Sequence, residues 1–378
     1  MQATDVFPVE YVERARRYHR PLYLAVLLDL VLGLALAALL AFAWPGDRLY
    51  DATGGGWALR GFEFTALVVG ISTLVRMPLS FWRGYVHEHR WSFSTQSPRE
   101  WLADKAKGFA VGLVLTEAAM LGFFALVHAF PRWWPLAAAA AAAVLVLVLS
   151  FLGPVVFEPV FNRFEPLADE ELARELRELA EEAGVPVRDV LVADASRRTK
   201  KLNAYVSGFG ATRRVVLYDT LLEQSDPREI RLVVAHELGH RRFRHIAQGT
   251  ALGMAGAGLT VVVLWALLRS QAVLAAIGAG GPGDPRVIPF LLLVATGLEL
   301  IGLPFGTALS RRWERQADRF SLELTRDPDA FEKAHRDLAE ANLSDVDPPR
   351  ALYLVLFTHP TPPERIEEAR RFAAARAA

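Results

Sequence analysis

Six long stretches of hydrophobic residues recur along the chain, four of them in its first 160 residues. They cover approximately residues 21–44, 61–82, 108–130, 134–156, 249–268 and 287–310. Each is near or above the ~20 residues that a helix needs to cross a bilayer. Stretches such as 137–149 contain almost no polar group, which argues against buried core helices of a soluble protein. The pattern predicts a mainly α-helical integral membrane protein with about six transmembrane helices.

The segments between the fourth and fifth stretches have the patterns of a small soluble α+β unit. Residues 168–184 show the charged periodicity of a surface helix. Residues 189–194 and 214–219 are rich in β-branched residues and read as strands, with a hairpin turn around 208–213. We expect Asn203–Gly208 to form an edge strand that pairs with an extended substrate, and a purely structural strand is an equally open alternative.

A helix should then begin at Asp226 and Pro227, because aspartate is a good N-cap and proline is favoured in the first turn. This helix carries residues 236–240 and could run directly into the fifth hydrophobic stretch, near the membrane boundary. These boundaries predict two units. Residues 1–160 form a membrane domain with four spans, and residues 161–378 form a second domain with this soluble part and two further spans.

The distribution of arginine and lysine predicts the orientation. They are concentrated before the first span, between the second and third, and after the sixth, whereas loop 270–285 has none. By the positive-inside rule the N-terminus and residues 157–248 are cytoplasmic. Residues 1–20 contain acidic side chains and do not resemble a cleaved signal peptide.

Composition narrows the chemistry. The 42 basic and 42 acidic residues balance, so nothing suggests a nucleic-acid partner. The chain has no cysteine, so a metal here must be bound by histidine and carboxylate.

The pentapeptide His236-Glu237-Leu238-Gly239-His240 is the most informative motif. Residues at i and i+4 share one face of a helix, so both imidazoles can hold one zinc ion. Glu237 can then act as the general base on a water molecule. The alternative is a helix surface with two solvated histidines.

A catalytic zinc needs a third protein ligand. A three-histidine site would need histidine at position 246, where the chain has Ile246, and we expect His245 to be a structural or surface residue. Glu314 and Asp318 are four residues apart, so one could ligate zinc while the other accepts a hydrogen bond from a ligating histidine. Alone, this would be a surface pair.

His359 and Arg365, near the C-terminus, could donate hydrogen bonds to the oxyanion that forms at a scissile carbonyl. A histidine in an ordinary loop is the alternative for His359.

Together these motifs resemble the type I CAAX prenyl proteases and their bacterial relatives, which include the heat-shock membrane protease. The resemblance covers nearly the whole chain and rests on residues 77–80, 85–88, 93–97, 158–162, 164–167, 203–205, 214–222, 236–240, 310–318, 359–360 and 365.

The resemblance implies the same site. His236, His240 and Glu314 match its zinc ligands, Glu237 its base and Asp318 its second-sphere aspartate. His359 and Arg365 match the residues that assist at the carbonyl, and Asn203, Ala204 and Tyr205 match the substrate-lining strand. It also implies a ring of membrane helices around a water-filled chamber, which would accommodate Asp29, Glu117 and Glu299. The chain has six spans where eukaryotic members have seven.

We therefore expect residues 161–378 to form a zinc metallopeptidase domain. The chain should be a zinc metalloendopeptidase with one Zn²⁺ per chain, a peptide or protein substrate and the lipid bilayer as its environment. The composition looks bacterial, which favours processing or quality control of membrane proteins in a plasma membrane. A zinc-stabilised membrane chaperone or scaffold with a vestigial site is the alternative.

Overall fold

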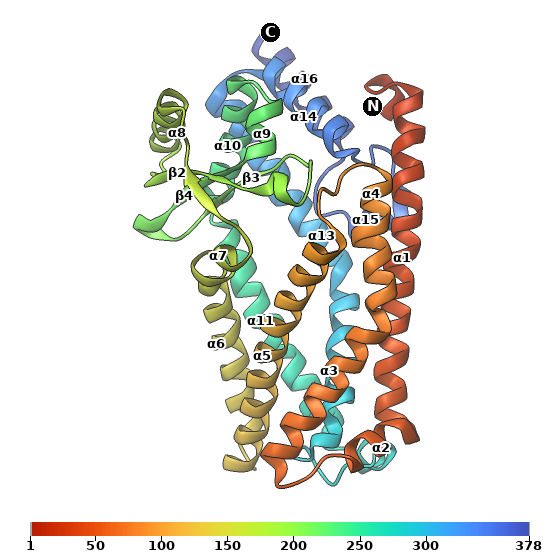
Figure 1. Ribbon diagram of the computed structural model, residues 1–378. Coiled ribbons are helices and arrows are strands. Elements are labelled where there is room, and N and C mark those ends of the chain that lie inside the picture. The colour runs from red at the N-terminus through yellow and green to blue at the C-terminus, as the bar shows by residue number, and fades with distance from the viewer. Residues whose placement is uncertain (1, 378) are drawn as a thin grey trace.

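The computed structural model describes residues 2–377 and confirms a mainly helical membrane protein (Figure 1). Six helices among these residues are long and apolar enough to cross a membrane. They are α1 (Val9–Phe42), α3 (Trp57–Phe81), α5 (Pro98–Ala129), α6 (Trp134–Leu152), α11 (His245–Leu268) and α13 (Ile288–Thr325). α3 continues through a π-helical segment, Trp82–His87, into α4 (Glu88–Arg90), and α6 continues through another, Gly153–Phe157, into α7 (Glu158–Phe161).

The outer surface of the spans is apolar. In the most hydrophobic window of each span, between 0% and 28% of the residues are buried inside the protein. Large side chains such as Leu74 and Phe305 are 70% and 77% exposed. Such a surface fits lipid rather than water. A buried cluster at the lower end, including Phe64, Phe124 and Leu268, joins the spans to α2 (Trp44–Asp51) and α12 (Gln271–Ala276).

A small sheet and the remaining helices lie at the opposite end of the bundle, together with both ends of the chain (Figure 1). These helices are α8 (Glu170–Glu182), α9 (Asp219–Gln224), α10 (Pro227–Arg242), α14 (Pro328–Asn342), α15 (Arg350–Leu356) and α16 (Pro362–Ala377). Leu176, Val215 and Leu238 belong to one buried core between α8, the sheet and α10. Whether the chain divides into two units near residue 160 stays a prediction.

The sheet has the order β1-β2-β4-β3. Its strands are β1 (Phe164–Pro166), β2 (Asp189–Ala193), β3 (Ala204–Ser207) and β4 (Arg214–Tyr218). β2 and β4 are parallel, whereas β3 is antiparallel to β4 through a turn that starts at Gly208 with φ +82°. Both strands predicted from β-branched residues are present, and β3 is an edge strand as expected. The strand β1 was not predicted from the sequence.

The helix that carries the histidine motif does not continue into the fifth span, contrary to one expectation. α10 ends at Arg242, and Arg244 adopts a left-handed conformation with φ +58° before α11 begins at His245. A left-handed residue ends the run of helical hydrogen bonds and redirects the chain. By contrast, α13 runs unbroken from the sixth span to Thr325 and carries Glu314.

The ionisable residues in the spans have three different environments. Asp29 forms a two-pronged ion pair with Arg76 and lines a cavity of about 520 Å³ between α1, α3 and α5. Glu299 is exposed. Glu117 is only 6% exposed, and neither of its carboxylate oxygens has a hydrogen-bond partner among residues 2–377. The expectation that Glu117 faces water is therefore wrong.

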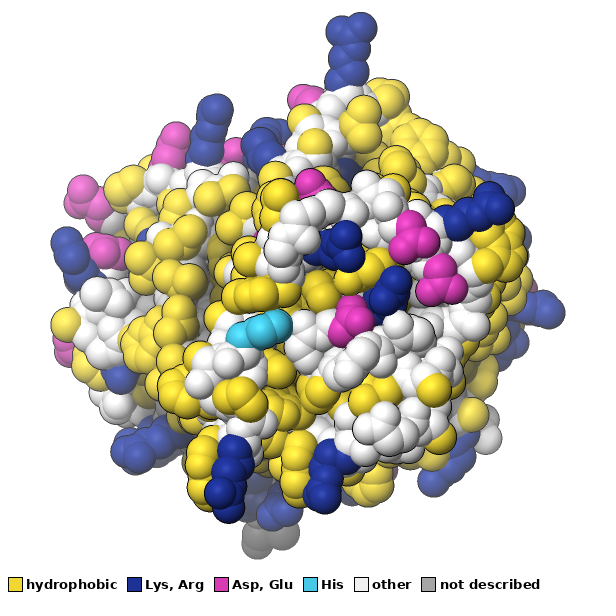
Figure 2. Space-filling model, turned by 90° about the horizontal axis from the view of Figure 1, so that it is seen from below, with side chains coloured by type: hydrophobic (Ala, Val, Ile, Leu, Met, Phe, Trp, Pro, Cys, Tyr) yellow, Lys and Arg dark blue, Asp and Glu magenta, His cyan; other side chains and the backbone are white. Residues whose placement is uncertain are grey.

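The end of the bundle far from the sheet carries charges of both signs between hydrophobic side chains (Figure 2). Arg286 lies 3.6 Å from Asp51 and 3.8 Å from Asp284 there. These ion pairs connect the end of α2 with the segment that precedes α13.

Candidate active site

α10 is positioned by its own sequence. Asp226 accepts a hydrogen bond from the Glu229 amide, so it is the N-cap that the sequence predicts. One face of the helix enters the core under the sheet, and the opposite side packs on α13. Gly239 permits this close approach, because an added Cβ would lie 3.1 Å from Ala317 Cα. The two helices are therefore near enough to share a site.

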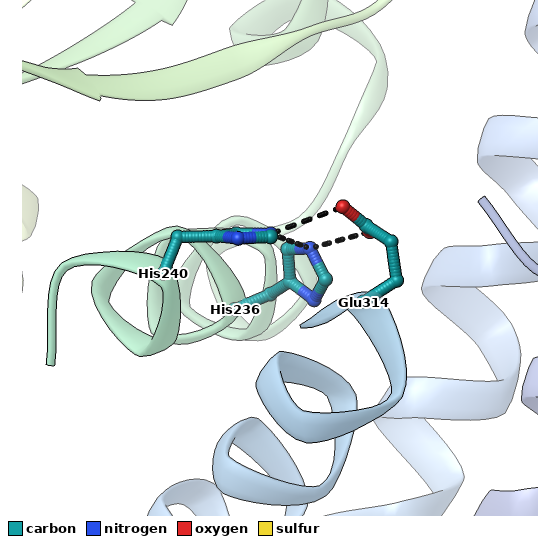
Figure 3. Close-up of side chains that lie close together, drawn as sticks. All are labelled: His236, His240 and Glu314. Atoms are coloured by element: carbon teal, nitrogen blue, oxygen red, sulfur yellow. Dashed lines mark hydrogen bonds and ion pairs between the residues drawn. The ribbon is translucent and has the colours of Figure 1, made fainter. Parts of the chain in front are cut away.

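His236, His240 and Glu314 converge where α10 meets α13 (Figure 3). The two histidine Nε2 atoms are 3.1 Å apart. Glu314 Oε2 lies 3.2 Å from His236 Nε2, and Glu314 Oε1 lies 3.2 Å from His240 Nε2. Ligands about 2.1 Å from a tetrahedral zinc ion are roughly 3.3 Å from one another. The three side chains therefore have the separations of a metal site.

The hydrogen bonds of the two histidines are compatible with a cation between their Nε2 atoms and Glu314. His236 Nδ1 lies 2.8 Å from Asp318 Oδ1, and His240 Nδ1 lies 3.0 Å from His245 Nδ1. With the protons placed on these Nδ1 atoms, both Nε2 atoms present lone pairs to a carboxylate. Glu314 Oε2 is buried and accepts no hydrogen bond from residues 2–377. Facing acceptors of this kind repel each other unless a cation joins them.

The electrostatic field of the site favours a cation. Burial acts to lower the pKa of His236, but Asp318 and Glu314 outweigh it and raise that pKa to about 9. Because the same carboxylates attract a proton and a metal ion, the two compete for this site.

Asp318 has a second partner on the side away from the metal position. Arg365 donates through Nε to Asp318 Oδ2 at 2.9 Å and through a terminal nitrogen to Oδ1. That terminal nitrogen also lies 3.2 Å from His236 Nδ1. The Asp318 side chain is 2% exposed and that of Arg365 14%. Arg365 is thus engaged with Asp318, and a direct contact with substrate stays a prediction.

The support for His240 was missed by sequence reasoning. His245 is 3% exposed, so of the two expected roles, structural or surface, it has the structural one. Its Nδ1 contacts His240, its Nε2 lies 3.0 Å from Gln316 Oε1, and its ring stacks on Trp313. His245 reaches His240 because Arg244 interrupts the helix between them. No sequence signal identifies Gln316.

A cavity of about 710 Å³ opens beside the site and is lined by His236, Glu237, His359 and Arg365. Burial raises the pKa of the Glu237 carboxyl, which suits a proton-accepting role near neutral pH. His359 is 59% exposed, and its Nε2 lies 3.4 Å from Glu314 Oε1. The loop before α16 therefore brings His359 to the metal position.

The predicted substrate-lining residues are the first two residues of β3 and the residue before it. Asn203 and Ala204 line this cavity, whereas Tyr205 does not. Tyr205 contacts Tyr218 edge to face and is hydrogen-bonded through its strand to β4. Ala204 and Tyr205 are neighbours in β3, so their side chains point to opposite faces, whereas Asn203 precedes the strand.

Two sequence families match the chain. Residues 166–373 match peptidase family M48, and residues 2–163 match the family described as CAAX prenyl protease N-terminal, five membrane helices. The chain belongs to peptidase family M48. The described part of residues 2–163 contains four candidate spans.

Several relatives agree with this M48 assignment. The chain is 34% identical to the uncharacterized metalloprotease YhfN of Bacillus subtilis over 313 residues, covering 82% of this chain and 73% of that protein. It is 29% identical to CAAX prenyl protease 1 of Saccharomyces cerevisiae, over 80% of this chain and 70% of that protein. The crystal structure of S. mikatae Ste24p matches with a TM-score of 0.86 and 25% identity, covering 97% of this chain and 90% of that one. The protein is a membrane metalloprotease of the M48 family.

Proposed function

We propose that the chain is a zinc endopeptidase whose metal is held by His236, His240 and Glu314. The observation that carries this proposal is the convergence of two imidazole lone pairs and an unsatisfied buried carboxylate oxygen on one point. Two histidines and one glutamate are a common ligand set of catalytic zinc, which keeps a fourth position open. The M48 family match supports the same chemistry.

The residues around this point have separate tasks. When bound, zinc supplies a Lewis acid that polarises the scissile carbonyl and lowers the pKa of a water molecule towards ~7. Glu237 takes the proton of the attacking water and passes it to the leaving amine. His359 donates to the oxygen that gains negative charge. Asp318 fixes the Nδ1 tautomer of His236.

The edge strand β3 orients the substrate by pairing with it as an additional strand. No other strand of residues 2–377 pairs with its outer edge, so an extended peptide can pair there when Arg241 releases the Val206 carbonyl. Asn203 and Ala204 line the cavity that contains Glu237. We infer that membrane proteins or peptides of a bacterial plasma membrane are cleaved here, on the cytoplasmic side. The charge pattern of the loops and the relation to the Bacillus subtilis protein support this inference.

Replacement of Glu237 by glutamine tests the mechanism. The variant should keep its metal and lose peptidase activity by about three orders of magnitude or more, because the proton acceptor is gone. Metal analysis and cleavage of an unfolded protein substrate measure the two effects. Undiminished cleavage by the variant would refute the mechanism, and activity unaffected by a chelator would refute the metal's role.

Glu314→Ala tests the third ligand. We expect both zinc content and activity to fall, whereas Glu237→Gln lowers activity alone. Full zinc occupancy in Glu314→Ala would exclude it from the ligand set. A chaperone with a vestigial site would retain its function in both variants. Incubation with prenylated peptides and unfolded membrane proteins, followed by mass spectrometry of the cuts, identifies the substrate class.

A further inference from the structure

A second cavity, of about 410 Å³, lies against the other metal-site histidine. It includes His240 and shares no lining residue with the 710 Å³ cavity that contains Glu237. We call it the interfacial pocket. Its remaining walls come from the end of α6, the β3–β4 loop, the turn after α10 and the start of α11.

The apolar part of the interfacial pocket lies between two membrane spans. α6 and α11 pack closely, and Ser150 Oγ lies 3.0 Å from Thr250 Oγ1. Phe151 and Ile246, at the mouth, are 50% and 38% exposed. Ala247 and Ala251 are small and leave room beside the helix. This half of the pocket is therefore open to the bilayer at the helix ends nearest the sheet.

Three arginines surround the other half. Arg213, Arg241 and Arg244 line the pocket, and none has an Asp or Glu of residues 2–377 within ion-pair distance. Arg241 donates to the Val206 carbonyl through Nε at 3.2 Å. The arginines thus form a concentration of positive charge that lacks a counterion within the described protein.

An apolar groove that ends in unpaired arginines is complementary to an anionic amphiphile. Guanidinium groups bind phosphate oxygens through paired hydrogen bonds. Basic residues at the ends of spans attract anionic lipid head groups, and small residues leave space for an acyl chain. A free anion would gain nothing from the apolar walls. A peptide segment would need partners for its backbone, which this half of the pocket does not offer.

We propose that the interfacial pocket binds one anionic phospholipid from the leaflet on the sheet side. Its phosphate contacts Arg213 and Arg244, and one acyl chain lies between α6 and α11. The lipid then touches three parts of the site's framework: the turn after α10, the β3–β4 loop and His240. Phe209 of that loop already contacts Phe151 of α6, with ring centroids 4.5 Å apart.

Lipid binding to the purified full-length protein tests this proposal, independently of any peptidase assay. Native mass spectrometry would compare dioleoylphosphatidylglycerol with dioleoylphosphatidylcholine. We expect at least about tenfold tighter binding of one phosphatidylglycerol molecule, since each basic side chain at an interface favours anionic lipid by about 1 kcal/mol. Equal affinities for the two lipids would overturn the proposal.

Two double variants locate the site. Arg213→Gln with Arg244→Gln should lose the preference for phosphatidylglycerol, by about tenfold in affinity. Arg17→Gln with Arg20→Gln is the matched control, because both residues are exposed on α1 at the same end of the bundle. The control should keep the preference. Equal losses in both double variants would show general surface attraction and would refute a specific site.

A third variant tests the apolar half. Ala251→Trp fills the groove while leaving the arginines in place, and we expect a similar loss of phosphatidylglycerol binding. Unchanged binding would overturn the placement of the acyl chain. Inorganic phosphate at the same concentration should not displace the lipid. Displacement by phosphate would refute the lipid site and indicate a simple anion site. Displacement by a prenylated peptide alone would instead identify a substrate site.

Discussion

His236 and His240 lie one turn apart on α10 and face the same carboxylate, but the Nδ1 atom of each meets a different environment. On the His236 side, Nδ1 contacts a buried carboxylate that is itself bound by a buried guanidinium. On the His240 side, Nδ1 contacts a neutral chain formed by His245 and Gln316. We refer to these as the ionic support and the neutral support.

Each support orients one histidine ring, but the free energy lost when a partner is removed differs between the two. A buried ion pair stabilises little overall, yet removing one partner leaves an uncompensated charge that costs several kcal/mol. A neutral hydrogen bond contributes about 1 kcal/mol, and its loss is correspondingly mild. The ionic support also places negative charge next to the metal position, whereas the neutral support adds none. The comparison therefore predicts unequal responses to equivalent changes.

Asp318→Ala should have the largest effect. It leaves Arg365 buried without a counterion, so we expect the free energy of unfolding to fall by about 3–5 kcal/mol. Thermal unfolding in detergent measures this loss. Asp347→Ala is the control, because its ion pair with Arg16 is 59% exposed on both sides and should contribute less than about 1 kcal/mol. Similar losses in the two variants would contradict the special status of the ionic support.

The second-largest effect should be a loss of stability at acidic pH, caused by protonation of a histidine beside the ionic support. His335 of α14 is buried beside Arg365, and burial followed by that charge lowers its pKa from 6.5 to about 3. Between these values the unfolded chain binds more protons than the folded protein, so stability falls as pH falls from 6.5 towards 3. The slope is at most about 1.4 kcal/mol per pH unit for this group. His335→Leu should flatten the stability profile measured by unfolding across this range, and an unchanged profile would be the contrary result.

His245→Ala breaks the neutral support and should have a smaller effect on folding. We expect about tenfold weaker zinc affinity, in the range found when outer partners of ligating histidines are removed, with a modest loss of stability. Competition with a metal chelator measures the affinity. A loss of stability as large as that of Asp318→Ala would show that the two supports do not differ as proposed.

Gln316→Leu should have the smallest effect. It removes only the outer acceptor of the neutral chain, so His245 keeps its contact with His240 and its stacking on Trp313. We expect zinc affinity to fall less than about fivefold, because one neutral hydrogen bond contributes about 1 kcal/mol. A larger loss of zinc affinity in Gln316→Leu than in His245→Ala would show that Gln316 does not act through His245.

Much of the fold could be predicted because its signals are local and periodic. Hydrophobic length identified the six spans, and the Asp226 cap and β-branched segments identified α10 and the strands beside it. The short strand β1 was missed because three residues, Phe164–Pro166, are too few to show alternation. Four-residue spacings brought His236, His240 and Glu314 into one hypothesis that the geometry supports.

The neutral support could not be predicted because it depends on a break in the helix. Arg244 adopts φ +58° without being glycine or asparagine, so no residue type announces the change of direction. Without that break, the five-residue spacing from His240 to His245 points away from the site. Gln316 becomes relevant only after His245 has been turned towards α13.

The two histidines and Glu314 are connected to the membrane spans in different ways. A break at Arg244 separates α10 from α11, whereas α13 carries Glu314 and crosses the membrane as one helix. A span changes its tilt when bilayer thickness and its own hydrophobic length differ. Such a tilt in α11 is absorbed at the break before it reaches His236 and His240, whereas a tilt in α13 moves Glu314 directly. We therefore expect the distance between Glu314 and the two histidines to depend on membrane thickness, as far as the packing of α10 on α13 allows them to move separately. We expect peptidase rates in bilayers of short and long acyl chains to differ, and identical rates would show that α13 is held rigidly by its neighbours.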